Sequence, residues 1–221
     1  MNIRLQFTLV VTFAAVGAPL WLPMGDLSGH TSQKNDADAL VRALGDFQPS
    51  LPGRLNSDGG PDAVEARRLA LYGQLVELGA RALPALSRGL ADPDVRIRRN
   101  VALFLNVSSM PRKSFGGPMD ITASLPALVV AVQDQDERVR HLSGQAIGNI
   151  GSKAASAVPA LIKLLQYPDE GSRNSACIGL AGIGPSAAPA LPALRSALSD
   201  SSEDVRRFAR RAIDKIEPRE Q

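Results

Sequence analysis

Aromatic residues, histidine and cysteine are scarce in this chain of 221 residues. Only 4% of the residues are aromatic although 44% are hydrophobic, so a core must be built from Ala, Leu, Ile and Val, which suits closely packed helices. Cys177 is the single cysteine, which excludes an internal disulfide and a thiolate metal cluster. The two histidines, His30 and His141, lie far apart without a nearby acidic cluster, so we expect no metal and no other cofactor.

A strong excess of one charge is also missing. Lys and Arg number 25 against 22 Asp and Glu, and this net charge of +3 is too balanced to indicate a nucleic-acid-binding surface. The chain has no phosphate loop and no Gly-x-Ser-x-Gly motif, and "GLAGIG" from Gly179 ends a helical pattern where a nucleotide loop would open one. Cys177 has no base nearby in the repeat register. These absences predict a protein that is not an enzyme.

Residues 1–25 have the layout of a secretory signal: Arg4, then an apolar run, then small residues. Prolines near the cleavage point are unfavourable for cleavage, so an uncleaved anchor is the rival interpretation, because Leu5–Met24 has about the length that spans a bilayer. A helix packed on the domain is a third interpretation. The first two predict an exported protein, periplasmic, secreted or anchored in the envelope. We expect a linker over 26–34 and no second apolar segment of this length.

What the chain does contain is an internal repeat. "LPAL" or a near copy occurs four times, and Pro126, Pro159 and Pro192 are 33 residues apart. After each copy comes a second helical pattern, starting at Val95, Val139, Ser172 and Val205. A pair of short helices cannot bury its own apolar face, and stacked neighbours supply the core. The pattern therefore predicts an all-α solenoid of about five stacked helix-turn-helix units.

We place the repeat domain at 35–221, with a degenerate first unit. The expected units are 35–79, 80–108, 121–151, 152–184 and 185–217, and the expected insertions are 48–62 and 108–120. Helix caps are expected from side-chain oxygens three residues before each second-helix pattern, at Asp92, Asp136, Asp169 and Ser202. Pro93 would then occupy the first helical position. Glycines end the second helices at Gly79, Gly151 and Gly184.

One arginine per unit forms a column: Arg68, Arg96, Arg140, Arg173 and Arg206. Asp134 precedes Arg140 by six residues, and Asp200 precedes Arg206 by six. Leu90 and Tyr167 stand at the equivalent places before Arg96 and Arg173. We interpret the column as a structural ladder that braces the turns, and its alternative is an anion-binding ladder.

"ALPALRSALSDSSEDVRRFARRAIDKI" and "AVPALIKLLQYPDEGSRNSACIGLAGIG" resemble HEAT repeats of the bacterial subtype shared with phycobilisome-lyase-type proteins. The resemblance covers about Asn35 to Glu217 and implies a right-handed superhelix whose Asp–Arg pairs run from unit to unit. One HEAT-repeat enzyme class, the deoxyhypusine hydroxylases, binds di-iron through repeated His-Glu pairs. Those pairs are absent here.

The resemblance and the repeat together predict a protein-binding scaffold. We expect the second helices to line a concave face that changes from apolar, at Ile97 and Val101, to basic. The expected partner-binding residues are His141, Gln145, Asn174, Arg207, Arg210 and Arg211, with Arg112, Lys113 and Phe115 in an inserted loop. A solvated end cap and a tolerated surface loop are the plain alternatives. An accessory role in tetrapyrrole attachment is the alternative function, and nucleic-acid binding is the weakest.

Overall fold

The computed structural model describes residues 32–47, 63–110 and 118–218, and these residues are helical with no β-strand. Residues 1–25, the insertion at 48–62 and the loop residues Arg112, Lys113 and Phe115 lie outside the described residues. The helices occur in successive pairs: α1 (Ser32–Ala43) and α2 (Ala63–Leu78), α3 (Leu83–Gly89) and α4 (Val95–Ser108), α5 (Leu125–Ala131) and α6 (Glu137–Ile150), α7 (Val158–Leu164) and α8 (Glu170–Ile183), α9 (Leu191–Ala197) and α10 (Glu203–Ile216).

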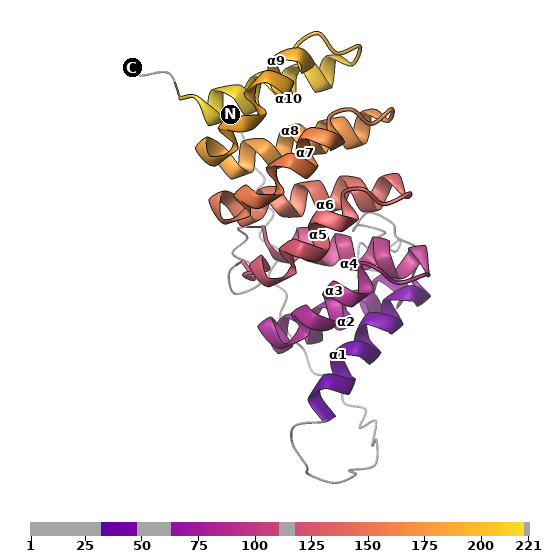
Figure 1. Ribbon diagram of the computed structural model, residues 1–221. Coiled ribbons are helices and arrows are strands. Elements are labelled where there is room, and N and C mark those ends of the chain that lie inside the picture. The colour runs from indigo at the N-terminus through magenta and orange to yellow at the C-terminus, as the bar shows by residue number, and fades with distance from the viewer. Residues whose placement is uncertain (1–31, 48–62, 111–117, 219–221) are drawn as a thin grey trace, which may run out of the picture.

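The pairs stack in chain order from α1 to α10 and form two layers (Figure 1). The short first helices α3, α5, α7 and α9 lie in one layer, and the longer second helices α4, α6, α8 and α10 lie in the other. Short 3-10 segments lead into the first helices, among them η5 (Gly151–Ala157) and η6 (Gly184–Ala190). The prediction of an all-α solenoid of stacked helix pairs is confirmed.

Local sequence explains where the helices begin and end. Each short first helix carries its proline in the first turn, where the missing N–H leaves no hydrogen bond unmade. Asp136, Asp169 and Ser202 are the N-caps of α6, α8 and α10, and their side chains accept hydrogen bonds from backbone N–H groups three residues on. The glycines between units adopt positive φ angles, 54° at Gly79, 73° at Gly151 and 69° at Gly184.

The predicted cap of α4 is wrong. Asp94, not Asp92, is the N-cap of α4 and accepts from the Arg96 N–H, so Pro93 precedes the helix. Asp92 instead accepts a hydrogen bond from the Asp94 N–H at 2.8 Å, as Asp134 does from the Asp136 N–H. The repeat pattern of α4 therefore begins two residues later in the chain than we predicted. The two alignments were hard to tell apart because an apolar residue followed by an arginine occurs twice in "DVRIRR".

The core runs between the two layers, and the second helices also pack closely on one another. Leu86, Leu105, Leu128, Leu161 and Leu180 are fully or almost fully buried along it. Glycines bring α6 and α8 into backbone contact: a Cβ atom on Gly179 would lie 2.7 Å from the Gly144 carbonyl oxygen. Helix α6 is therefore packed backbone to backbone against α8.

The first unit departs from the repeat. Its 3-10 segment η1 (Leu44–Asp46) packs against α4, where the buried Asn100 amide donates to the carbonyls of Leu44 at 2.9 Å and Phe47 at 3.1 Å. Helix α2 reaches α4 through Tyr72, whose ring meets Phe104 edge-on with centroids 5.1 Å apart. The first unit is therefore held on α4 by side-chain contacts that do not belong to the repeat pattern.

One further run, Glu170–Ala197, has the length and hydropathy of a membrane-crossing helix. The expectation of no second segment of this length was therefore wrong. The run comprises α8, η6 and α9 and turns at Gly184. Leu180, Ile183 and Leu194 from it are buried in the core between the layers.

Candidate functional site

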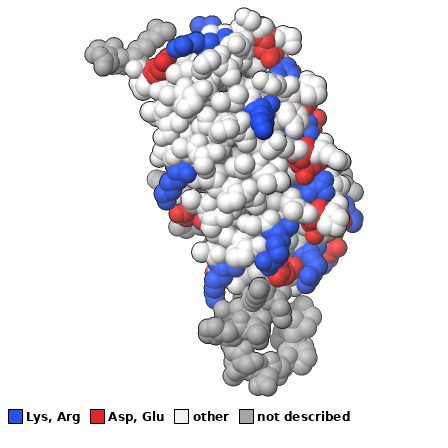
Figure 2. All heavy atoms as spheres, viewed as in Figure 1, with Lys and Arg blue, Asp and Glu red and all other residues white. Residues whose placement is uncertain are grey.

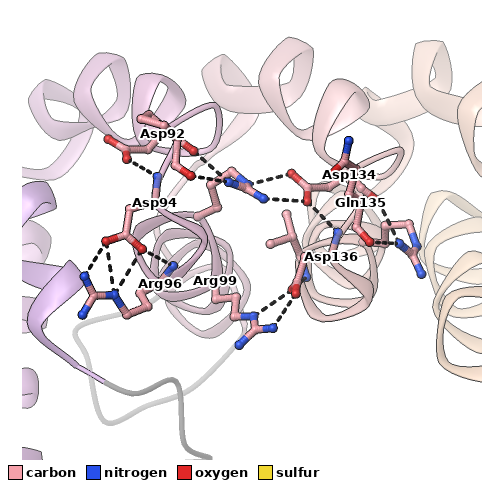
Figure 3. A network of polar contacts seen from close by, with 11 residues as sticks. Asp92, Asp94, Arg96, Arg99, Asp134, Gln135 and Asp136 are labelled. Atoms are coloured by element: carbon pink, nitrogen blue, oxygen red, sulfur yellow. Dashed lines mark hydrogen bonds and ion pairs between the residues drawn. The ribbon is translucent and has the colours of Figure 1, made fainter.

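Arginine–aspartate pairs join successive units at the turns. The Arg98 guanidinium donates to the Asp92 carbonyl of its own turn at 2.9 Å and to both carboxylate oxygens of Asp134 in the next unit, at 2.8 and 3.1 Å. Arg173 repeats this arrangement with the Tyr167 carbonyl and Asp200. Arg96, predicted for the column, lies on the surface and pairs with Asp94 (Figure 3). Arg98 takes its place because of the shifted register.

Arg140 makes a different connection. Tyr167 stands where the other units carry an aspartate, and the Arg140 guanidinium lies 4.7 Å from the centre of its ring. The guanidinium instead donates to the Asp169 carboxylate and, at 2.9 Å, to the Ser172 hydroxyl. Arg206, in the last unit, donates to the carbonyls of Asp200 and Ser201.

Arg68 also departs from the column, because it is buried and pairs with Glu65 in its own helix at 2.6 Å.

A second arginine reinforces the ladder, since Arg99 donates to both oxygens of the Asp136 cap (Figure 3). The hydrogen bonds from Arg99 and Arg173 hold the pKa values of Asp136 and Asp200 below the ordinary carboxyl value.

These bonds decide the role of the ladder. The guanidinium groups of Arg98, Arg140 and Arg173 already contact carbonyls and carboxylates and are not free to bind an anion. On the face shown in Figure 2, most charged side chains, of both signs, lie along one edge of the stack, fewer lie at the opposite edge and the upper end, and the middle is mostly uncharged. The ladder therefore braces the stack, and it does not form a basic strip.

The outward side of the second helices is a different surface, which we call the second-helix face. Its residues occupy two repeat positions: Arg99, His141, Asn174 and Arg207, and Leu103, Gln145, Ile178 and Arg211. His141, Gln145, Asn174 and Ile178 are half-buried, and Arg207 and Arg211 are exposed. The predicted apolar residues Ile97 and Val101 are buried in the core instead, since the α4 register is shifted.

A hydrogen-bonded strip of polar side chains crosses the second-helix face between α4 and α8. The Asn106 amide donates to Gln145 Oε1 at 2.9 Å, and Gln145 Nε2 lies 3.0 Å from His141 Nε2. His141 Nδ1 lies 3.1 Å from the Gly171 carbonyl oxygen, and the exposed Asn149 donates to Asn106 Oδ1 at 3.1 Å. The repeat pattern predicted His141 and Gln145 but gave no signal for Asn106 or Asn149, which occur in single units.

Next to this strip lies a pocket of about 350 Å³, the α8–α10 pocket. Its apolar surface comes from Ile178, Ala181 and Phe208, and Gly182 leaves one side open. Arg211, Lys215 and Asn149 supply its polar atoms. It is the place where the second-helix face offers both apolar surface and positive charge.

The three predicted arginines of α10 have different settings. Arg207 pairs with Asp204 at 2.7 Å and lies over the Phe208 ring, 5.2 Å from its centre. Arg211 borders the α8–α10 pocket. Arg210 occupies the repeat position that Gly144 and Cys177 have in the earlier units, and at Gly144 this position faces the following unit. Because α10 belongs to the last unit, Arg210 lies at the open end of the stack.

A wider hollow of about 710 Å³ lies between the second and third units, bordered by Leu90, Ala127 and Val130 and by the ladder pair Arg98 and Asp134. Val130 is 68% exposed. The matching positions of the other first helices hold Arg88, Lys163 and Ser196. This hollow is the second apolar surface that a partner is able to reach.

The described residues offer little for catalysis. They contain no group of three or more His, Cys, Asp or Glu side chains able to hold a metal ion. Cys177 is fully buried, and burial raises the pKa of its thiol to about 12, so it is a thiol and not a nucleophilic thiolate at neutral pH.

This two-layered stack defines the chain as an α-solenoid repeat protein. Residues 125–214 match the family model described as HEAT repeats, which confirms the resemblance seen in the sequence. No curated protein matches the chain.

Solved structures show the same fold at low sequence identity. A designed armadillo repeat protein in complex with the peptide (KR)4 is 22% identical, with a TM-score of 0.57 over 82% of both chains. The CpcE–CpcF complex of phycocyanin lyase from Nostoc sp. PCC7120 is 20% identical, with a TM-score of 0.53 over 77% of this chain and 68% of the other. An engineered protein is 20% identical, with a TM-score of 0.56 over 86% of this chain and 93% of the other.

Proposed function

We propose that the protein is a non-catalytic scaffold that binds a segment of a partner protein along its second-helix face. The observation that carries the proposal is the continuous arrangement of hydrogen-bonding, apolar and cationic groups across α6, α8 and α10, ending at the α8–α10 pocket. Solenoid folds of this type are typical of protein-binding scaffolds, because stacked repeats present an extended surface. The ladder arginines Arg98, Arg140 and Arg173 lie at the turns, so they leave the second-helix face to other side chains.

The polar groups of the face suit a polypeptide backbone. Asn174 is half-buried on this face and its Oδ1 has no hydrogen-bond partner among the described residues, so a rotation of the side chain lets this oxygen accept from a ligand N–H group. The neighbouring strip of His141, Gln145 and Asn149 offers both donors and acceptors. A bound segment that crosses α6 and α8 has its amides within reach of these groups.

The structural comparison is consistent with this use of the fold. The designed armadillo repeat protein was solved in complex with the peptide (KR)4, so a solenoid of similar fold binds a peptide. In this chain the α10 end of the second-helix face is itself positively charged. We therefore do not infer a basic ligand for this chain from the basic peptide bound by the designed protein.

We further propose that the scaffold works in the cell envelope or outside the cell. Residues 1–25 support this location because they have the layout of an export signal or an anchor. N-terminal sequencing of the protein purified from each cell fraction tests the location. A mature N-terminus near residues 18–26, or full-length protein in the membrane fraction, supports it, and full-length protein confined to the cytosol contradicts it.

Tetrapyrrole attachment remains the second candidate. The likeness to the phycocyanin lyase complex supports it, at the level of fold alone. A visible chromophore that copurifies with the protein, or transfer of one to an acceptor protein, would favour this candidate over the scaffold.

Site-specific photocrosslinking tests the proposed face. Benzoylphenylalanine placed at Asn174 or Gln145 reports contacts of the second-helix face, and the same group at Lys163, exposed on α7, reports the other layer. A fourth position, Val130, reports the wider hollow. We expect one partner to crosslink from Asn174 and Gln145 and not from Lys163. Crosslinks from Val130 or Lys163 alone would place the binding surface elsewhere.

A further inference from the structure

We propose that the bound segment is acidic and carries an apolar side chain that enters the α8–α10 pocket, while its carboxylates contact Arg211 and Lys215. This inference rests on the proposed function and adds the chemical class of the partner. It commits to acidic side chains of a polypeptide as the source of the carboxylates.

The pocket has the shape of an anchor site. Ile178 is half-buried, and Ala181 and Phe208 lie beside it, so apolar surface is open to solvent at this point. Gly182 lines the pocket without a side chain at the position that Lys215 has in the next unit, and α6 packs so closely there that a Cβ atom would lie 2.6 Å from Gly148 Cα. The close contact of α6 and α8 therefore keeps this site free of a side chain. Burying a Leu or Phe side chain there removes apolar surface from water on both partners.

The charge around the pocket is not neutralised. Arg211 and Lys215 form no ion pair with any of the described residues, although Asp214 lies next to Lys215 on the same helix. By contrast, Arg195 on α9 is held by Glu217 and Arg207 by Asp204. Arg211 and Lys215 are therefore the cations of this face that remain available to a ligand carboxylate.

The repeat register also fixes where the acidic residues lie. At the position of Arg211, α6 and α8 carry Gln145 and Ile178, and at the position of Lys215 they carry Asn149 and Gly182. Arg99 on α4 is paired with Asp136, so the positive charge of this face that has no ion-pair partner among the described residues is confined to α10. A bound segment has its acidic residues over α10 and its uncharged part over α6 and α8.

Fluorescence anisotropy with defined peptides and the full chain tests this assignment. The probe is a fluorescein-labelled peptide of sequence Gly-Glu-Leu-Glu-Glu-Leu-Gly with a blocked C-terminus. Three matched peptides replace every Glu with Lys, every Glu with Gln, or every Leu with Ser. We expect the acidic apolar peptide to bind about 10-fold more tightly than the Lys and Gln peptides, with an advantage that shrinks as salt rises.

Variants locate the contact. Arg211→Glu and Lys215→Glu are each expected to weaken binding about 3- to 10-fold, because each replaces an attraction by a repulsion. Lys163→Glu on α7 makes the same charge change in the other layer and is expected to leave binding unchanged. Ala181→Leu fills the pocket and is expected to abolish the preference for Leu over Ser. Circular dichroism of each variant confirms that the helices are intact.

The outcomes separate the inference from the proposed function. Equal binding of the acidic and Lys peptides, or equal loss in Lys163→Glu and Lys215→Glu, would overturn the inference. If the Lys or Gln peptide binds best and Asn174→Ala weakens it, the face binds peptide but the partner is not acidic. If the acidic peptide does not bind even at low salt, the inference fails, and the photocrosslinking result decides the proposed function.

Discussion

Arg98 in one unit and Asp134 in the next are joined by two hydrogen bonds, 2.8 and 3.1 Å long, between a guanidinium and a carboxylate that are both largely buried. Arg98 also donates to the carbonyls of Asp92 and Pro93 in its own turn. One side chain therefore fixes the shape of a turn and the position of the following unit at once. Because solenoid units contact only their neighbours, such links carry stability along the stack.

Arg98→Ala should destabilise the fold by about 1.5–3 kcal/mol, since it removes charge-assisted hydrogen bonds and leaves the largely buried Asp134 carboxylate without its cation. Arg96→Ala is the matched control, because Arg96 pairs with Asp94 on the surface and should change the free energy of unfolding by about 1 kcal/mol at most. Urea denaturation followed by circular dichroism measures both. Equal losses would show that Arg98 has no special structural role.

Acid should weaken the ladder. The pKa values of Asp136 and Asp200 are lowered in the folded protein by hydrogen bonds from Arg99 and Arg173. In the unfolded protein these carboxyls have a pKa of about 3.9, so as the pH falls they bind protons before the folded protein does. The stability that the lowered pKa values contribute is therefore complete above the unfolded pKa and is lost as the pH falls through the folded pKa values. The urea midpoint should therefore drop between about pH 5 and pH 3, and Asp200→Asn should drop less over the same range. A wild-type midpoint independent of pH would contradict this.

Gly182→Ala should destabilise the protein by about 1–3 kcal/mol, because the new methyl group would meet the backbone of Gly148 and push α6 and α8 apart. Gly73 in α2 provides the control, since a Cβ atom there meets nothing within 4 Å. Gly73→Ala should stabilise the protein by up to about 1 kcal/mol through helix propensity. Thermal unfolding of both variants makes the comparison, and a harmless Gly182→Ala would contradict the close contact.

Asn100→Ala should loosen the N-terminal end of the stack. It removes the donor that holds the buried carbonyls of Leu44 and Phe47, at a cost of about 1–3 kcal/mol. Hydrogen exchange should become faster over 37–47 and stay slow in α8. The exposed Asn149 is the control, and Asn149→Ala should leave exchange at 37–47 unchanged. Faster exchange throughout the chain would instead indicate global destabilisation.

Cys177 should resist alkylation in the folded protein. Its thiol is buried between α8 and its neighbours and has a pKa of about 12, so little thiolate is present and access is blocked. Iodoacetamide at mildly alkaline pH should label it in urea and not in buffer, as intact mass measures. Rapid labelling of the folded protein would reopen the question of a reactive cysteine.

The register of α4 shows where sequence reasoning reached its limit. In "DPDVRIRR" the pairs Asp92 and Asp94, Val95 and Ile97, and Arg96 and Arg98 each lie two residues apart, so two alignments fit the helical pattern equally well. Packing removed the ambiguity, because Ile97 and not Val95 is buried. Arg98 then falls six residues after Asp92, as Arg140 does after Asp134.

Tyr167 posed a different difficulty. The sequence showed that an aspartate was missing before Arg173, but the residue whose pairing changes is Arg140 in the preceding unit, which pairs with Asp169 instead. The ladder links neighbouring units, and that partnership depends on how far each unit is rotated against the next. Spacing along the chain does not contain this rotation.

The sequence by itself determined the helix pairs, their prolines, most of their caps and the glycines that end them, because these follow from local backbone chemistry repeated in each unit. It also determined that the predicted partner-binding residues of α6 and α8 share one face of the stack, since helical periodicity fixes which side chains of a helix lie on the same side. Only the tertiary structure decided the partners of the ladder arginines, the strip from Asn106 to His141 and the α8–α10 pocket. Those features form between helices, where distances depend on how closely the backbones pack.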